Sequence, residues 1–137
     1  MRFLDTNILV YAALNQDPRK HRLAALLVKD ALQMNDGVLS VQVINEFTNI
    51  LFKKTKRRAD EIRKLIEIFS PLNRMDMTAV LVNDAIGIKD RYGIQYYDAL
   101  IIAAAKQCGC DTILSEDFND GQVYDGILCR NPFKHGC

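Results

Sequence analysis

The sequence lacks the long apolar runs of membrane and exported proteins. No stretch approaches the roughly 18 consecutive apolar residues of a transmembrane helix. The residues after Met1 and Arg2 do not form the apolar segment and small-residue cleavage site of a signal peptide. The sequence therefore predicts a cytoplasmic protein with no membrane partner.

Proline and glycine are scarce, with 3 and 7 residues among 137. No linker rich in Pro, Gly and Ser, no internal repeat and no low-complexity tract interrupts the chain. A chain of this length is typical of one domain and can bury a core without disulfide or metal support. We therefore expect a single domain that covers residues 1–137.

The chain also has no marked excess of positive or negative charge, because 18 Lys and Arg residues nearly balance 17 Asp and Glu residues. The net charge of +1 gives no overall attraction to nucleic acid, although a local basic patch stays compatible with it. The two histidines, His21 and His135, have no ligand-like spacing and are interpreted as surface residues. The cysteines are Cys108, Cys110, Cys129 and Cys137. We interpret them as free thiols, since their spacing is not the usual Cys-x2-Cys of zinc sites.

Short apolar segments alternate with segments of helical periodicity. Strands are expected at residues 2–5, 38–39, 74–77, 112–115 and 127–129. Helices are expected at about 6–13, 18–34, 40–53, 60–70, 78–92 and 97–108, with Thr6 or Asn7 as the cap of the first. This alternation predicts an α/β fold, a three-layer α/β/α sandwich around a short, mainly parallel central sheet. In such folds functional groups lie beyond the carboxyl ends of the strands.

Three acidic residues lie beside apolar segments, where a carboxylate is costly unless it is paired or bound to a cation. Asp5 ends the first strand, Glu46 lies on the flank of an apolar helical stripe, and Asp98 precedes a buried helix. Each also has a structural explanation: a helix cap, a boundary glutamate that covers apolar surface, and an acid that complements the helix dipole. Around Asp98, the neighbouring Tyr96 and Tyr97 are expected to leave little water.

A fourth acid lies in a crowded segment. Asp117 follows the strand that ends at Ser115, and Glu116, Asp120 and Asp125 are close to it in sequence. Like charges held together raise one another's pKa, and a divalent cation would reverse that penalty. Alternate side chains of an extended segment point to opposite faces, so Asp117 would share a face with Ser115 while Glu116 would point away. Asp117 is therefore preferred to Glu116.

Together the four acids predict a divalent metal site. Carboxylates without histidine or cysteine ligands favour Mg²⁺ or Mn²⁺ over zinc. Mg²⁺ is typically held by carboxylates and substrate phosphate oxygens, which points to phosphate-ester chemistry. The metal would activate a water and neutralise charge developing on phosphorus. The expected catalytic and metal-binding residues are Asp5, Glu46, Asp98 and Asp117.

Five segments, in this order along the chain, carry a family resemblance. They are Phe3 to Tyr11, Ser40 to Glu46, Tyr97 to Ile101, Leu114 to Gly121, and Asn131-Pro132-Phe133. The most specific parts are Leu4-Asp5-Thr6-Asn7 and the segment from Ser115 to Gly121. With these segments the chain resembles the PIN-domain nucleases, and among them the VapC-type toxins of prokaryotic toxin–antitoxin pairs.

The resemblance implies a Mg²⁺- or Mn²⁺-dependent endoribonuclease that cleaves single-stranded or looped RNA. It implies that the four acids named above bind the metal and that Asn7 and Ser115 are supporting residues. It also implies a homodimer and a small antitoxin partner that blocks the site. Tyr97 departs from the family pattern, in which small or polar residues are common at this position, and is expected to alter substrate fit.

A basic cluster lies at the expected end of the helix that carries Glu46. Its members are Lys53, Lys54, Lys56, Arg57 and Arg58. The cluster is interpreted either as a set of RNA phosphate contacts or as a solvated turn between helices, and short charge runs are more often the latter.

Two other functions remain open from the sequence. A non-catalytic PIN-like module that binds RNA or protein would keep the fold and bind metal weakly or not at all. A receiver-like phosphoacceptor domain also gathers acids at strand ends, but it usually has paired acids near the first strand and a lysine after a late strand. Here Asp5 stands alone, and no lysine closely follows residues 112–115.

Overall fold

The computed structural model describes residues 1–134, which form six strands and six helices. The strands are β1 (Arg2–Leu4), β2 (Gly37–Ser40), β3 (Asn73–Met75), β4 (Thr112–Leu114), β5 (Val123–Tyr124) and β6 (Ile127–Arg130). The helices are α1 (Thr6–Ala13), α2 (Pro18–Met34), α3 (Val41–Lys54), α4 (Ala59–Ile68), α5 (Ala79–Tyr92) and α6 (Tyr96–Gln107). The expectations for His135 and Cys137 lie outside the described residues.

The strands form one sheet in the order β3-β2-β1-β4-β6-β5. β5 is antiparallel to β6, and the other neighbouring pairs are parallel. Phe3 of β1 is in register with Val38 of β2 on one side and Ile113 of β4 on the other. The chain thus builds the sheet outward from β1 through β2 and β3, then returns to place β4 on the opposite side of β1. Ligands of doubly wound sheets bind at such a reversal, beyond the carboxyl ends of the strands.

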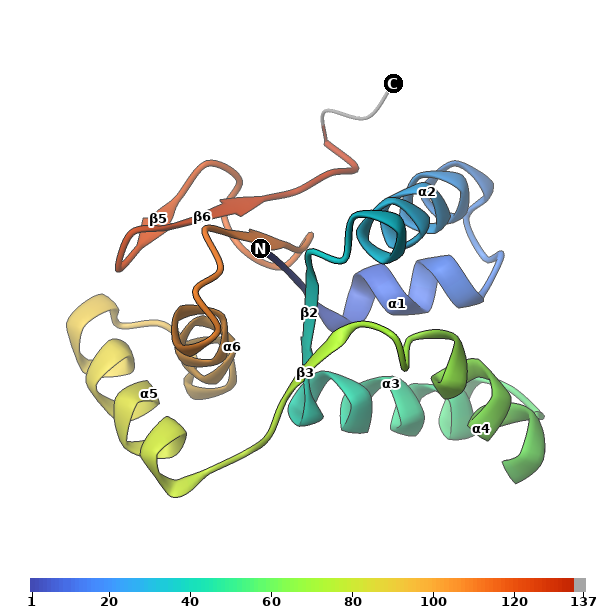
Figure 1. The fold of residues 1–137 in the computed structure, drawn as a ribbon, viewed down its shortest axis with the longest axis horizontal. Coiled ribbons are helices and arrows are strands. Elements are labelled where there is room, and N and C mark those ends of the chain that lie inside the picture. The colour runs from blue at the N-terminus through green and yellow to red at the C-terminus, as the bar shows by residue number, and fades with distance from the viewer. Residues whose placement is uncertain (135–137) are drawn as a thin grey trace.

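Helices cover both faces of the sheet, with α5 and α6 on one side and α1 to α4 on the other (Figure 1). α6 packs against β2, β4 and β6. Its residues 99–105 are all buried, as the apolar run predicts. The predicted three-layer α/β/α sandwich with a mainly parallel sheet is confirmed. Within residues 1–134, none of the helices combines the length and apolar character needed to cross a membrane.

Polar caps set the helix starts. Ser40 and Thr78 cap α3 and α5 through their hydroxyl oxygens. The expectation that Thr6 or Asn7 caps α1 is wrong. The cap is Asp5, whose Oδ1 accepts the backbone N–H of Thr6 at 2.7 Å, and this confirms the structural explanation of Asp5 as a helix cap. Asp5 therefore belongs both to the end of β1 and to the start of α1.

The strand β5 was not expected from the sequence, because two residues are too few for a periodic pattern. It forms a hairpin with β6 through Asp125 and Gly126, which both have positive φ values of 48° and 82°. Asp-Gly is a preferred pair for a two-residue hairpin turn of this kind. The Asp125-Gly126 pair could therefore have predicted this hairpin from the sequence.

The cysteines of the described part of the chain are free thiols, as predicted. They are Cys108, Cys110 and Cys129. Burial is the main cause that raises the pKa of Cys110 and of Cys129 to about 12. These two thiols are therefore protonated core residues near neutral pH.

Candidate functional site

Buried polar side chains are concentrated at one place in the fold. Among residues 1–134 they are Asp5, Thr6, Ser40, Gln42 and Ser115. Ser40 is the cap of α3, and the other four surround the carboxyl end of β1. No buried side-chain nitrogen or oxygen in this part of the chain lacks a hydrogen-bond partner. The hydrogen bonds that offset this polar burial also fix the arrangement of the site.

Asp5 is the most enclosed acid of the site, with 3% of its surface exposed. Its Oδ2 accepts the hydroxyl of Ser115 at 2.6 Å, and its Oδ1 accepts the N–H of Thr6. Burial raises the pKa of Asp5 to about 6; the two hydrogen bonds oppose the rise, and the charges of Asp117 and Glu46 add to it. A raised pKa within a group of acids is typical of functional carboxylates.

Asn7 connects Ser115 to Asp117. Its Nδ2 donates to Ser115 Oγ and to Asp117 Oδ2, both at 3.1 Å. The backbone N–H of Asp117 also donates to Ser115 Oγ, at 3.0 Å. Asp117 itself is exposed to solvent. Asn7 and Ser115 thus contact the predicted acids, as supporting residues would, and Asp117 stays accessible to a ligand.

Glu46 joins the group from α3. Its Oε2 accepts the hydroxyl of Thr6 at 2.6 Å, and its Oε1 accepts Gln42 Nε2 at 3.1 Å. Gln42 Nε2 also donates to the carbonyl of Tyr97, at the start of α6, at 3.2 Å. The contacts of Thr6 and of Gln42 with Glu46 were both missed from the sequence. Gln42 lies four residues before Glu46, on the same helix face, and that spacing could have revealed it.

Asp98 lies half-buried in the first turn of α6. Burial raises its pKa, and the charges of Asp117 and Glu46 raise it further. The expectation that Tyr96 and Tyr97 together exclude water here is wrong for Tyr97, which is 64% exposed because its side chain points outward from α6. The four predicted acids therefore come from four different segments and lie close enough for their charges to interact.

The donor chemistry of this group suits a hard cation. The acids supply oxygen atoms, which Mg²⁺ and Mn²⁺ prefer, and zinc would favour histidine or cysteine. Within residues 1–134, however, no three Asp, Glu, His or Cys side chains are already spaced to hold an ion. The residue types fit the metal, and its coordination stays a prediction.

Glu116 belongs to a separate group of contacts. Its Oε1 accepts the hydroxyl of Tyr11 and its Oε2 accepts Lys20 Nζ, both at 2.8 Å. Lys20 also lies 4.9 Å from the centre of the Tyr11 ring, a cation–π distance. Glu116 is thus neutralised by a lysine, while Asp117 is bonded to the group around Asp5. These contacts favour Asp117 over Glu116 as the fourth acid.

Asp120 and Asp125, which crowd Asp117 in sequence, make other contacts. Asp125 accepts Arg91 Nη2 at 2.7 Å and Lys106 Nζ at 3.0 Å, on α5 and α6. Asp120 accepts the backbone N–H that directly follows β6 at 2.9 Å. The sequence predicted that Asp120 and Asp125 lie close to Asp117 and add negative charge there. For Asp125 this is wrong, because the β5–β6 turn places its carboxylate beside Arg91 and Lys106.

Two hollows border Glu46. The first, which we name the Lys54 hollow, has a volume of about 270 Å³, and its lining includes Glu46, Asp117, Ile50 and Lys54. The second has a volume of about 410 Å³, and its lining includes Met77 and Tyr97. Of the predicted basic cluster, Lys54 lines the first hollow; Lys53, Lys56, Arg57 and Arg58 are not among its lining residues. Of the five basic residues, only Lys54 thus lies beside the acidic group within the described part of the chain.

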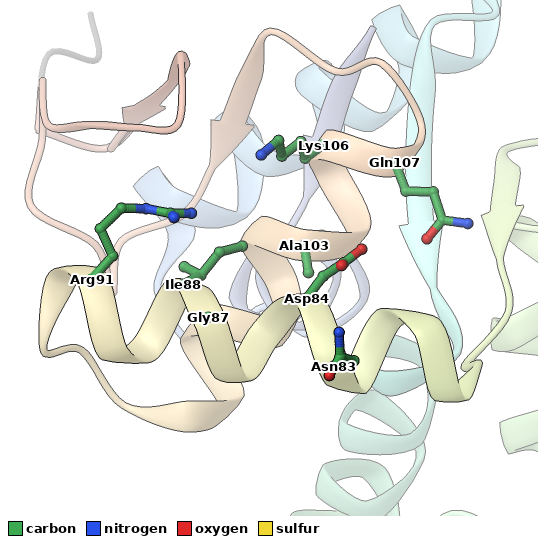
Figure 2. Close-up of a pocket in the computed structure, with 8 residues that line it drawn as sticks. All are labelled: Asn83, Asp84, Gly87, Ile88, Arg91, Ala103, Lys106 and Gln107. Carbon is green, nitrogen blue, oxygen red and sulfur yellow. The ribbon is translucent and has the colours of Figure 1, made fainter.

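A larger hollow, of about 450 Å³, lies between α5 and α6 (Figure 2). α5 contributes Asp84, Gly87 and Arg91, and α6 contributes Lys106. Arg91 and Lys106 are both paired with Asp125. This hollow contains none of the predicted site residues, and its two cations share one carboxylate, that of Asp125.

Solved structures share this fold. A toxin–antitoxin complex from Klebsiella pneumoniae aligns with a TM-score of 0.69 at 18% identity, over 93% of this chain and 96% of that chain. VapC20 from Mycobacterium tuberculosis, a toxin that cleaves the sarcin-ricin loop, aligns with a TM-score of 0.65 at 20% identity, over 82% and 87% of the two chains. VapBC2 from Rickettsia felis, bound to a DNA fragment from its promoter, aligns with a TM-score of 0.65 at 20% identity, over 95% and 97%.

These identities are low, so the structural likeness establishes the fold. A comparison with curated proteins found no match. A family comparison is informative, because the sequence pattern of the PIN domain matches residues 2–123. That range contains all four predicted acids, together with Asn7 and Ser115. The chain therefore belongs to the PIN domain family.

Proposed function

We propose that this protein is a Mg²⁺- or Mn²⁺-dependent endoribonuclease that hydrolyses RNA phosphodiester bonds as the toxin of a toxin–antitoxin pair. One observation carries the proposal: four acids come together from separate segments. The charges of Glu46 and Asp117 act both on Asp98 and on Asp5, a buried carboxylate whose pKa is raised to about 6. Membership of the PIN domain family and the toxins among the structural neighbours support a nuclease of this type.

The four acids, Asp5, Glu46, Asp98 and Asp117, would hold the ion through their carboxylate oxygens. When bound, the ion would supply an activated water and compensate the charge that develops on phosphorus. Three of the four carboxylates already accept a hydrogen bond from a neighbouring side chain. Such donors orient ligands before metal and substrate bind, which lowers the cost of assembling the site.

The proposal includes partners and location. Two of the structural neighbours are a toxin–antitoxin complex and VapBC2 bound to promoter DNA, and they support a small antitoxin partner here. A homodimer would bury exposed apolar side chains such as Val80 and Ile86 of α5, which are 64% and 57% exposed. With an RNA substrate and an antitoxin as partners, the protein would act in the cytoplasm.

RNA cleavage with and without EDTA tests the proposal. Wild-type protein is expected to cleave RNA with Mg²⁺ or Mn²⁺ and to stop when EDTA is added. Asp5→Asn keeps the size of the side chain and removes its charge, so it is expected to lower the cleavage rate by about 100-fold or more. Asp76→Asn, at an exposed aspartate outside the site, is the matched control and is expected to cleave normally. Cleavage that survives EDTA, or equal rates for Asp5→Asn and wild type, would contradict the mechanism.

The spacing of the acids favours a second candidate. Because no three of them within residues 1–134 are already placed around one point, a non-catalytic module that binds RNA or protein fits the same fold. Calorimetric titration with Mn²⁺ separates the two functions. Absence of binding at millimolar Mn²⁺ would support the module, and binding that Asp5→Asn weakens would support the nuclease.

A further inference from the structure

We propose that the Lys54 hollow is a subsite for one nucleotide of single-stranded RNA adjoining the phosphate that is cleaved. Lys54 would contact an RNA phosphate, and Val10 and Ile50 would contact the base. The inference rests on the proposed function and specifies how its substrate would lie. Its starting point is that Glu46 and Asp117 line this hollow as well as belonging to the acidic group.

The hollow combines the two surfaces that a nucleotide requires. Val10 and Ile50 are half-buried and offer apolar contact, while the exposed Gln16 offers hydrogen-bonding groups. Its volume of about 270 Å³ lies just below the roughly 300 to 1,000 Å³ of pockets for drug-sized ligands. It is thus sized for one nucleotide, and proteins recognise RNA commonly through single-stranded bases that are splayed out of a stack.

The charges of the hollow explain why a phosphate would be placed at Lys54. Glu116 also lines the hollow, but its charge is compensated by Lys20 at 2.8 Å. Lys54 is exposed and has no carboxylate within ion-pair distance among residues 1–134. A cation with no partner next to a group of acids is free to bind the backbone of an RNA strand.

The wall of the hollow is held in place by neighbouring contacts. Tyr11, one of its lining residues, donates its hydroxyl to Glu116 at 2.8 Å and packs edge-on against Phe133, with ring centres 5.1 Å apart. The backbone N–H of Glu116 donates to Asn7 Oδ1 at 3.3 Å. A wall that is ordered before binding lowers the entropy cost of holding a nucleotide.

The second hollow beside Glu46 has a different character. Its lining comprises Gln42, Asn45, Glu46, Met77, Tyr97 and Leu100, so this part of the described chain places no Lys or Arg there. The charge of an RNA backbone would find no counter-charge on that side. Of the two hollows beside Glu46, the Lys54 hollow is therefore the one with a positive charge for an RNA phosphate.

The first test measures RNA binding by fluorescence anisotropy with a labelled 12-nucleotide single-stranded RNA. The background variant is Asp5→Asn, in EDTA, which prevents cleavage and removes one repelling carboxylate. Lys54→Gln is expected to weaken binding by about tenfold, the order of one charge-assisted hydrogen bond. It is also expected to reduce the slope of log K against log salt by about 0.7, since one phosphate contact is lost. Lys29→Gln, at an exposed lysine of α2 outside the basic cluster and outside the hollow, is the matched control and is expected to change both much less.

The second test identifies the base contact by methyl NMR of the wild-type protein in EDTA. Uridine, cytidine, adenosine and guanosine 5′-monophosphates are titrated separately, and ribose 5-phosphate serves as the probe without a base. At least one nucleotide is expected to shift the methyl signals of Val10 and Ile50. Ribose 5-phosphate is expected to leave these signals nearly unchanged, because it lacks the base that would contact them.

The outcomes separate the subsite from the proposed function. Equal effects of Lys54→Gln and Lys29→Gln on RNA binding, or unchanged Val10 and Ile50 signals with all four nucleotides, overturn the subsite. Wild-type protein that fails to cleave RNA, while Lys54→Gln still weakens binding selectively, removes the nuclease and leaves the subsite standing.

Discussion

Ser115 Oγ donates a hydrogen bond of 2.6 Å to Asp5 Oδ2 and thereby joins two residues that are 110 positions apart in the chain. The two residues follow β4 and β1, which are neighbours in the sheet. The same Ser115 oxygen accepts from Asn7 and from the backbone of Asp117. One hydroxyl thus links the buried Asp5 to the exposed Asp117 at the carboxyl ends of β1 and β4, where the order in which strands are added to the sheet reverses.

Removal of the hydroxyl of Thr6 is expected to weaken metal binding. Thr6→Val keeps the shape of the side chain and removes the donor to Glu46 Oε2, which lies 2.6 Å away. Loss of a group that orients a ligand typically lowers metal affinity about 10- to 100-fold. Calorimetry with Mn²⁺ measures the change. Thr6→Ser retains the hydroxyl and is expected to bind like wild type, and equal affinity for the Val and Ser variants would disprove this role.

Glu116 and Asp117 are expected to respond differently to neutralisation. Asp117→Asn removes an acid of the proposed metal site and is expected to reduce Mn²⁺ affinity by about 10-fold or more. Glu116→Gln loses the charge that pairs with Lys20 and leaves the group around Asp5 intact, so its Mn²⁺ affinity is expected to stay close to that of wild type. Mn²⁺ titration of both variants decides the assignment. If Glu116→Gln binds Mn²⁺ more weakly than Asp117→Asn does, the fourth metal ligand is Glu116 and not Asp117.

The titration of Asp5 is expected to make the metal-free protein less stable as pH rises. Its pKa is about 6 in the folded protein against an ordinary value of 3.8, mainly because of burial. Between these two values the folded state binds more protons than the unfolded state, so the contribution of Asp5 to stability is fully present below about pH 4 and is lost as pH rises through about 6. The loss is on the order of 3 kcal/mol, since each pKa unit corresponds to about 1.36 kcal/mol.

Denaturant unfolding in EDTA between pH 4 and pH 7 measures this dependence. Asp5→Asn cannot titrate at this position and is expected to lack this part of the pH dependence. The difference in unfolding free energy between the two proteins isolates Asp5 from other acids. A difference that stays constant with pH would show that Asp5 has an ordinary pKa.

Asp125 is expected to stabilise the fold through charge and through backbone conformation. Burial favours its protonated form, but hydrogen bonds from Tyr92, Lys106 and Arg91 outweigh this effect, and the net pKa is lowered. The contribution is therefore present above the unfolded pKa, near 3.8, and is lost as pH falls through the lower folded pKa.

Two variants of Asp125 separate these contributions. Asp125→Asn keeps a side chain that tolerates the positive φ of 48°, and it is expected to lower the unfolding free energy by about 1 kcal/mol or less, because Arg91 and Lys106 are half exposed. Asp125→Ala also places an unsuited residue at positive φ and is expected to cost about 1 kcal/mol more. Thermal or denaturant unfolding measures both. Equal unfolding free energies for Asp125→Asn and Asp125→Ala would show that the backbone conformation at this position makes no contribution to stability.

Local patterns predicted most of the fold. The alternation of apolar strands and amphipathic helices predicted the parallel sheet, because strand and helix periods are properties of neighbouring residues. The two-residue β5 was missed, because so short a segment has no period. The cap of α1 was assigned to Thr6 or Asn7, and a cap was also given as the structural explanation of Asp5. All three residue types can cap a helix, and the choice depends on where β1 ends.

The site was predicted less completely than the fold. Residue type and motif order singled out Asp5, Glu46, Asp98 and Asp117, whose ligand roles stay predictions. The contact between Thr6 and Glu46 was missed, because this hydrogen bond spans 40 positions and leaves no local pattern. Around Asp98, the buried residues 99–102 were predicted, but the exposure of Tyr97 was not, because periodicity in the sequence did not reveal that this side chain points outward.

The sequence by itself determined the α/β class, the family and the set of acids, since these depend on residue types and their order. The tertiary structure decided which polar residues meet. Sheet order places β1 beside β4, so Ser115 contacts Asp5, and the β5–β6 turn carries Asp125 to Arg91 and Lys106. Contacts between residues far apart in the chain depend on how strands and helices pack, and the local sequence does not encode that packing in a readable pattern.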